Sequence, residues 1–243
     1  MKTMILFATL ALGCATASAQ KIETRAINGF TSVNVQNGIE VQYTQGPVES
    51  VTIEYKDANV KSDLVTDCYG SELKIYAKDH GDAKGAKVYI TQKSLSAITI
   101  GTGAKLNIVG KLDVKDLKIT LATGGVLEGA INCTGTCSLD ARTGAVAKAA
   151  ITAHKFNGDI TGASTVKLEG NAADADIYCS GATLLAGKFC AAKAGIVAKN
   201  ASAVLINIKD AVKADADESS AITYYGTPDK ITVAENSYAV RRR

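Results

Sequence analysis

Three aspartates in the middle of the chain are the residues that could do hydrolytic chemistry. Asp140, Asp159 and Asp176 follow one another at intervals of 19 and 17 residues. Two carboxylates that flank a glycosidic bond can cleave it, one as an acid and the other as a base or nucleophile. On stacked segments of chain, such a pair has to occupy one column of facing positions. Whether these aspartates do so depends on the repeat in which they lie.

Other catalytic arrangements are not indicated. His80 lies in a polar turn, His154 follows a short apolar segment, and neither accompanies a serine or cysteine nucleophile motif. A calcium-binding nonapeptide repeat and a phosphate-binding glycine loop are absent from the sequence. We therefore expect no catalytic residue, no cofactor and no bound metal.

Five cysteines follow the first nineteen residues, and an odd number cannot all pair within one chain. Cys133 and Cys137 could form a local disulfide. The last four also allow a zinc interpretation, but structural zinc sites usually combine two closely spaced pairs, and ten residues separate the last two. We expect those four to be small core residues. The five are Cys68, Cys133, Cys137, Cys179 and Cys190.

Tyr76 and Tyr89 are the candidate binding residues. In their strands both alternate with apolar neighbours, so their side chains should point outward. Exposed tyrosine rings on a flat sheet can stack on sugars or peptides. Tyr43 and Tyr55 instead share the apolar side of their strands, and we expect them to be buried.

A phrase of small residues recurs through the chain and defines its organisation. Its third positions are 104, 125, 145, 163, 182, 203 and 221, which lie 18 to 21 residues apart. A fixed period of about twenty residues indicates one structural unit stacked on copies of itself. The copies are Thr102-Gly103-Ala104, Thr123-Gly124-Gly125, Thr143-Gly144-Ala145, Thr161-Gly162-Ala163, Ser180-Gly181-Ala182, Ala201-Ser202-Ala203 and Ser219-Ser220-Ala221.

The segments between these phrases predict strands. Apolar and polar residues alternate there in runs of three to five, which is typical of half-buried strands. We predict an all-β fold, a single-stranded parallel β-helix (β-solenoid) with coils of about 20 residues, right-handed as is usual for parallel crossovers. A second corner is expected at Gly110, Gly129, Gly170, Gly187 and Gly226.

The repeat gives no support to an aspartate column. Asp140, Asp159 and Asp176 lie five, four and six residues before the third position of the next phrase. This drift predicts that the three carboxylates are separate, outward and solvated.

The first nineteen residues have the features of a signal peptide. Lys2 precedes an apolar segment at 4–12, and a small-x-small site ends at Ala19, so we expect cleavage between Ala19 and Gln20. The alternative is a lipoprotein signal in which Cys14 is acylated. Either predicts export to the periplasm, the outer-membrane surface or the medium. No later segment is long and apolar enough for a transmembrane helix.

The remaining chain is predicted to be one domain. Residues 20–28 form a lead, 29–228 the β-helix, and 229–243 a strand at 231–233 with a basic tail. Cleanly alternating strands in 29–77 indicate the first coils and an N-terminal β cap, which a solenoid needs to cover its open edge.

Charge excludes one class of partner. The sequence has 27 Lys and Arg residues against 24 Asp and Glu, and the formal net charge is +3. No basic face with interleaved aromatic residues occurs, so we expect no nucleic-acid binding.

Three places resemble the head GIN domain family, described as auto-transporter adhesins and found mainly in exported proteins of Bacteroidota. They are residues 30–55 with Asn37-Gly38-Ile39-Glu40-Val41 at the centre, the recurring Gly-Ala corner, and Ser220-Ala221-Ile222-Thr223-Tyr224-Tyr225-Gly226-Thr227-Pro228. Together they cover about residues 29 to 228. The resemblance implies a β-helical exported domain, and it supplies no catalytic residues.

These observations favour an exported, non-catalytic β-helix protein of the cell envelope or surface that binds a glycan or an envelope protein. Two alternatives stay open. A carbohydrate-active enzyme is favoured if carboxylates converge in a groove, and a purely structural role is favoured if no exposed aromatic or apolar patch exists.

Overall fold

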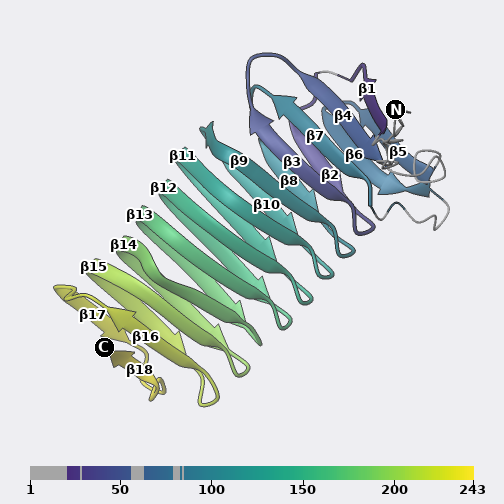
Figure 1. Ribbon diagram of the computed structural model, residues 1–243. Helices are drawn as coiled ribbons and strands as arrows, with labels where there is room; N and C mark the ends of the chain where they lie inside the picture. The colour runs from purple at the N-terminus through teal and green to yellow at the C-terminus, as the bar shows by residue number, and fades with distance from the viewer. Residues whose placement is uncertain (1–20, 28, 56–62, 79–82, 84) are drawn as a thin grey trace, which may run out of the picture.

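The computed structural model describes residues 21–27, 29–55, 63–78, 83 and 85–243, and every regular element among them is a strand (Figure 1). The strands are β1 (Lys21–Arg25), β2 (Ser32–Val35), β3 (Glu40–Gln45), β4 (Ser50–Tyr55), β5 (Leu64–Tyr69), β6 (Glu72–Ala77), β7 (Lys87–Gln92), β8 (Ala97–Ile100), β9 (Lys105–Val114), β10 (Leu117–Leu121), β11 (Val126–Ala141), β12 (Val146–Thr161), β13 (Thr165–Ser180), β14 (Thr183–Lys199), β15 (Ala203–Ala216), β16 (Ala221–Tyr225), β17 (Lys230–Val233) and β18 (Val240–Arg242).

Successive coils stack in parallel and build a solenoid of about eight turns with coils of about 19 residues. Each of β11 to β15 makes most of one coil by itself, and each of β11 to β14 pairs with the next strand along most of its length. The prediction of an all-β, single-stranded parallel β-helix is confirmed. The strands are longer than the alternating runs in the sequence suggested, because hydrogen-bonded pairing between coils continues on both sides of the second corner.

The N-terminal cap has an order that the sequence does not reveal. The first coil, β2 and β3, lies between two later ones: β2 pairs with β6 and β8, and β3 pairs with β7 and β9. Antiparallel strands then cover the outermost coil, with β5 on β6, β4 on β7 and β1 on β4. The cap therefore replaces the open parallel edge with short antiparallel pairs at the N-terminal end of the stack in Figure 1.

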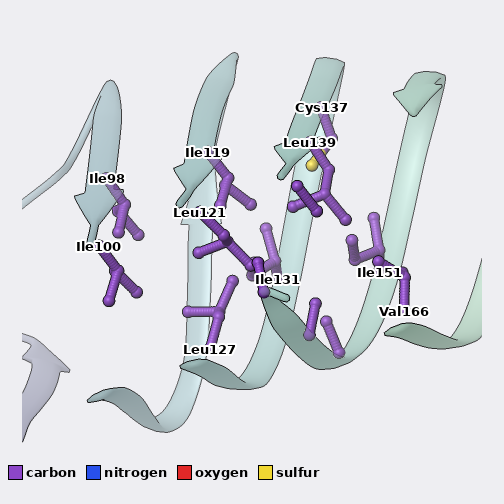
Figure 2. Packing of buried hydrophobic residues seen from close by; sticks show 14 of the residues in the cluster. Ile98, Ile100, Ile119, Leu121, Leu127, Ile131, Cys137, Leu139, Ile151 and Val166 are labelled. Carbon is purple, nitrogen blue, oxygen red and sulfur yellow. The ribbon is translucent and has the colours of Figure 1, made fainter. Parts of the chain in front are cut away.

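The core consists of ladders of inward side chains, one from each coil. Figure 2 shows Ile98, Ile119 and Leu139 on successive strands pointing into the same interior. Two coils further along, Ile177 continues this ladder, but Gly158 stands between them. The Phe156 ring lies there, with its Cε1 only 3.0 Å from the position that a Gly158 Cβ would take. This ladder is therefore filled, and burial of its apolar side chains stabilises each of these coils against the next.

Small residues form a buried column at the first corner. Strand register places residues 104, 125, 145, 164, 182, 202 and 220 directly above one another. The third positions expected from the repeat are thus wrong by one residue at 163, 203 and 221. At 163 and 203 the slip arises because Ala163 and Ala201, directly before the column, take left-handed φ values of 61° and 60° that glycine takes in other corners.

Serines in this column tie each corner to the one before it. The hydroxyl oxygens of Ser164, Ser202 and Ser220 accept hydrogen bonds from the backbone N–H groups of Ala145, Ala182 and Ser202, at 3.2, 3.4 and 3.1 Å. These N–H groups are buried, where an unpaired donor would cost free energy. The choice of serine over alanine is therefore part of the hydrogen bonding of the stack.

The predicted second corner is confirmed at four of its five glycines. Gly110, Gly129, Gly170 and Gly226 have positive φ values of 80°, 144°, 109° and 99°. Gly187 does not, and it lies within a shift in the pairing of β14 with β15, between Ala186 and Cys190.

Part of the C-terminal segment forms strands, and its three terminal arginines are exposed. The expected last strand is β17, but Arg241 and Arg242 also belong to a strand, β18, which pairs with β16. Ile231 and Val233 continue inward ladders yet are 51% and 40% exposed, since no described strand covers them. This end of the stack is therefore an open apolar edge.

Asp217 anchors the last corners through its carboxylate. The backbone N–H groups of Asn200 and Ser219 donate to it at 2.7 and 3.1 Å, and the Ser219 hydroxyl donates at 2.8 Å. The Asn200 N–H foremost, then the Ser220 hydroxyl and the Ser219 donors, lower the pKa of Asp217 from 3.8 to about 2.

The depressed pKa of Asp217 predicts an acid-sensitive contribution to stability. A carboxylate with a lowered folded-state pKa stabilises the fold above pH 3.8 and loses this effect as the pH falls toward 2. Asp217→Asn should lower the melting temperature at pH 7 and flatten its decline between pH 4 and 2. Glu218→Gln, a change at the exposed neighbour, is the control and should follow the wild-type curve. Identical acid profiles for both variants would contradict this prediction.

Several expectations lie outside the described residues: the signal peptide at 1–19, its cleavage between Ala19 and Gln20, acylation of Cys14, and His80. Of the predicted lead at 20–28, residues Lys21–Arg25 form β1. In the described part of the chain, no helix has the length and apolar character needed to cross a membrane.

Candidate functional site

One long outer surface carries most of the candidate residues. We call it the flank: the outward side of β6, β2, β8, β10, the second halves of β11 to β15, and β17, which pair in this order. On it, side chains from successive coils form straight columns about 4.8 Å apart, the ordinary strand spacing. Several hollows lie along this surface, and three of them contain or adjoin the candidate residues.

The largest hollow, the flank groove, is a depression of about 640 Å³ lined by Asp140, Asp159, Asp176 and Tyr178 among others. Asp140 and Asp159 are register partners on β11 and β12, so they occupy one column. Asp176 lies in the adjacent column, paired with Asn157. All three aspartates therefore converge on one groove.

The expectation that the aspartates share no column is thus wrong for Asp140 and Asp159. Both lie five residues before their true corner residues, Ala145 and Ser164, and the apparent drift came from taking Ala163 as the corner. For Asp176, which belongs to another column, the expectation holds. A count made from the serine would have found the pair in the sequence.

Cations already hold two of these carboxylates. The Arg142 guanidinium donates two hydrogen bonds to Asp140, and this carboxylate raises the pKa of Arg142. The Lys155 ammonium lies 2.8 Å from Asp176, which raises the pKa of Lys155. Asp159 forms no such ion pair with any residue that the structure describes, and it is exposed beside Tyr178, its register partner on β13.

Tyr178 is the aromatic residue of the groove. It lies outward on β13, 43% exposed, between Asp159 on β12 and Val197 on β14. Gly195, two residues before Val197, has no side chain, which leaves the groove open beside the Tyr178 ring. An exposed ring beside hydroxyl, amide and carboxylate side chains can receive a flat, hydroxylated ligand. Tyr178 was not among the binding residues expected from the sequence, although its alternation with Ile177 and Cys179 indicates an outward side chain.

A second hollow, of about 310 Å³, adjoins the groove toward the C-terminal end; we call it the lysine hollow. Lys193, Lys213 and Lys230 surround it, and Ala211 and Gly195 form its floor. Lys213 and Gly195 also line the flank groove, so the two hollows are continuous.

Tyr76 lines the third hollow, of about 330 Å³, at the cap end of the flank; we call it the cap hollow. Its other walls include Asn34, Gln36 and Thr102, which are linked because Gln36 donates to Asn34 at 2.7 Å and accepts from Thr102 at 3.0 Å. Burial, followed by nearby Asp67, raises the pKa of Tyr76. The side chain points outward as predicted.

Tyr89 also points outward, but it does not share a surface with Tyr76. It lies on β7, which pairs with β3 and β4 and belongs to the opposite part of the coil. Its hydroxyl donates to Glu54 at 2.6 Å, and this hydrogen bond raises the pKa of Tyr89. Tyr43 and Tyr55 are buried as expected, with exposed fractions of 0% and 6%.

The five cysteines in the described part of the chain are free thiols. Cys133, Cys137 and Cys179 are core residues as predicted, but Cys190 is partly exposed on the outer side of β14, in register with Asn171 and Asn207. The Cys133 and Cys137 thiols interact, which lowers the pKa of Cys133 and raises that of Cys137. No three His, Cys, Asp or Glu side chains converge as a metal site anywhere in the described ranges.

Comparison with known proteins assigns the family. A family model described as "Putative auto-transporter adhesin, head GIN domain" matches residues 29–228, which is most of the chain. The chain belongs to the head GIN domain family. None of the curated proteins is similar enough to count as a match.

Solved structures share the fold of this head GIN domain protein. One described as a putative adhesin from Parabacteroides merdae has a TM-score of 0.80 at 17% identity, over 92% of this chain and 95% of that one. Two from Parabacteroides distasonis, each with a TM-score of 0.74, are described as a putative lipid binding protein (17% identity, 92% and 96% coverage) and a putative adhesin (16%, 93% and 97%). At such low identity, the likeness concerns the fold alone.

Proposed function

We propose that this head GIN domain protein is exported and acts as a non-catalytic, adhesin-like binding protein of the cell envelope or surface. Its ligand is an extended glycan that lies along the flank. The observation that carries this proposal is the flank groove, in which the exposed Tyr178 ring adjoins Asp159 and Asn157. The family description as an adhesin and the signal-peptide features of residues 1–19 support binding and export.

The shape of the flank favours a polymer over a small compact ligand. Tyr76 and Tyr178 lie six strand spacings apart on the same surface, roughly 29 Å. An extended chain can contact both rings, whereas a monosaccharide can contact only one. A lipid, which the description of one structural neighbour mentions, fits this surface less well because charged and polar side chains line all three hollows.

The test measures how strongly each polysaccharide of a panel retards the purified protein in a native gel. Tyr178→Ala should weaken binding about 3- to 10-fold, the loss expected for one aromatic stacking contact. Tyr76→Ala should have a smaller effect, and only on long chains. Tyr238→Ala is the matched control, because this tyrosine is 76% exposed and outside all three hollows. If the wild type and Tyr178→Ala bind the polysaccharide with equal affinity, the groove is not the binding site.

The convergence of Asp140 and Asp159 favours a second candidate, a retaining glycoside hydrolase. Carboxylates on adjacent strands are spaced about as closely as the 5 Å that such enzymes use. Against it, Arg142 already holds Asp140. The same polysaccharides are therefore assayed for new chain ends. Cleavage that disappears in Asp159→Asn would establish the hydrolase, and binding without cleavage supports the adhesin.

A further inference from the structure

The lysine hollow is the part of the flank that neutral sugar binding does not explain. Lys193, Lys213 and Lys230 come from β14, β15 and β17 and border one depression of about 310 Å³. Lys193 and Lys230 belong to one column, separated only by Ala211, whose small side chain leaves the space between them empty. Three ammonium groups thus point around a floor made of Ala211 and Gly195.

We propose that the ligand is an acidic glycan, and that one of its carboxylate or sulfate groups binds between Lys193, Lys213 and Lys230. This inference rests on the proposed glycan-binding function and names the chemical class of the ligand.

The charge around the hollow supports an anionic ligand. None of the three ammonium groups forms an ion pair with a residue in the described part of the chain, whereas Lys155 and Lys199 on the same flank are paired with Asp176 and Asp215. Asp174 and Asp176 also border the hollow, but Asp176 is committed to Lys155 at 2.8 Å. Among the lining residues, this leaves Asp174, the register partner of Lys193, against three ammonium groups, so the hollow keeps an excess of positive charge.

The position of the hollow fits one sugar chain that crosses both depressions. Gly195 and Lys213 line the groove as well as the hollow, and Tyr178 pairs with Val197, two residues along β14 from Gly195. A sugar ring stacked on Tyr178 would bring an anionic substituent of the same or the next residue toward the lysines. Asp140 and Asp159 repel anions at the other end of the groove, so they accept sugar hydroxyls there and fix the direction of the chain.

The lysine hollow also argues for a glycan over a protein partner. Its rim presents ammonium groups, each a compact charge with three donors, above a narrow floor without a large apolar side chain. Protein interfaces usually bury an apolar or aromatic centre and are depleted in lysine. Small anionic groups on a thin, hydrated chain fit this geometry better.

The experiment compares polygalacturonate with the same polymer after its carboxyls are reduced to alcohols. The full exported protein should bind the acidic polymer at least tenfold more tightly at 50 mM NaCl, and 300 mM NaCl should remove most of that preference, since salt screens exposed charges. Lys193→Gln/Lys213→Gln/Lys230→Gln should bind the two polymers about equally. The control, Lys115→Gln/Lys167→Gln/Lys209→Gln, changes net charge by the same amount outside both hollows and should keep the preference.

Two results would overturn the inference while leaving glycan binding intact: equal binding of both polymers by the wild type, or an equal loss of preference in the control triple variant. Binding of neither polymer, nor of any other acidic or neutral polysaccharide in the panel, would overturn the glycan function together with the inference. Melting temperatures of both triple variants, expected to match the wild type, verify that the substitutions leave the fold unchanged.

Discussion

Replacing Phe156 with alanine is expected to destabilise the protein by about 3 to 5 kcal/mol, the usual cost of truncating a fully buried aromatic residue. Phe156 is completely buried, and its ring packs against Phe189 with the centroids 5.4 Å apart and the planes tilted by 58°. It also fills the space that Gly158 leaves in the inward ladder between Leu139 and Ile177. Urea denaturation followed by far-UV circular dichroism measures the loss.

A double-mutant cycle separates this packing from general loss of volume. Gly158→Ala alone should destabilise, since the new Cβ would lie 3.0 Å from the Phe156 ring. In the Phe156→Ala background the same substitution should stabilise, because it refills part of the cavity. The coupling energy should be about 1 kcal/mol or more, as is usual for residues in contact. Additive effects would show that the ring does not occupy the glycine's place.

Gly170→Ala is expected to cost about 3 kcal/mol, because backbone strain and a steric clash act together. Gly170 has a φ of 109°, and a Cβ there would lie 2.1 Å from the carbonyl oxygen of Ile151, its register partner in the preceding coil. No side-chain rotation relieves a clash with backbone. Relief therefore requires the two coils to separate at the second corner, which breaks their ladder.

Gly144→Ala is the matched control for this prediction. Gly144 has a φ of 72° in the first corner, but a Cβ there would meet no atom within 4 Å. Only the conformational cost of a left-handed residue remains, about 1 to 2 kcal/mol. If both variants lose the same stability in denaturant, close stacking at the second corner is not what selects glycine.

The fold was predictable because its signal repeats. Every coil needs small residues at the same corner and alternating apolar residues between corners, so seven weak copies of the pattern support one another. Chain order in the cap was not predictable, because β2 and β3 fit between β6–β7 and β8–β9 by ladders whose apolar residues are interchangeable.

The aspartate column was missed in the sequence because of a single residue. Ser164 fills the buried column as well as alanine does, and its hydroxyl gains a partner in the Ala145 N–H group. Taking Ala163 as the corner shifted the count and hid the aspartate column. Tyr178 was missed for a different reason: its role depends on neighbours in other coils, Asp159 and Val197, that local alternation does not reveal.

The stacking of coils has a mechanical consequence for an adhesin-like protein. Each coil from β11 to β15 is hydrogen-bonded only to the coil before it and the coil after it. Tension applied between the two ends would load one ladder at a time and peel the open C-terminal coil first. Each released coil of about 19 residues adds roughly 65 Å of extended chain. Under force spectroscopy this gives a series of equal steps, so the molecule lengthens under load and spares whatever contact the remaining coils hold.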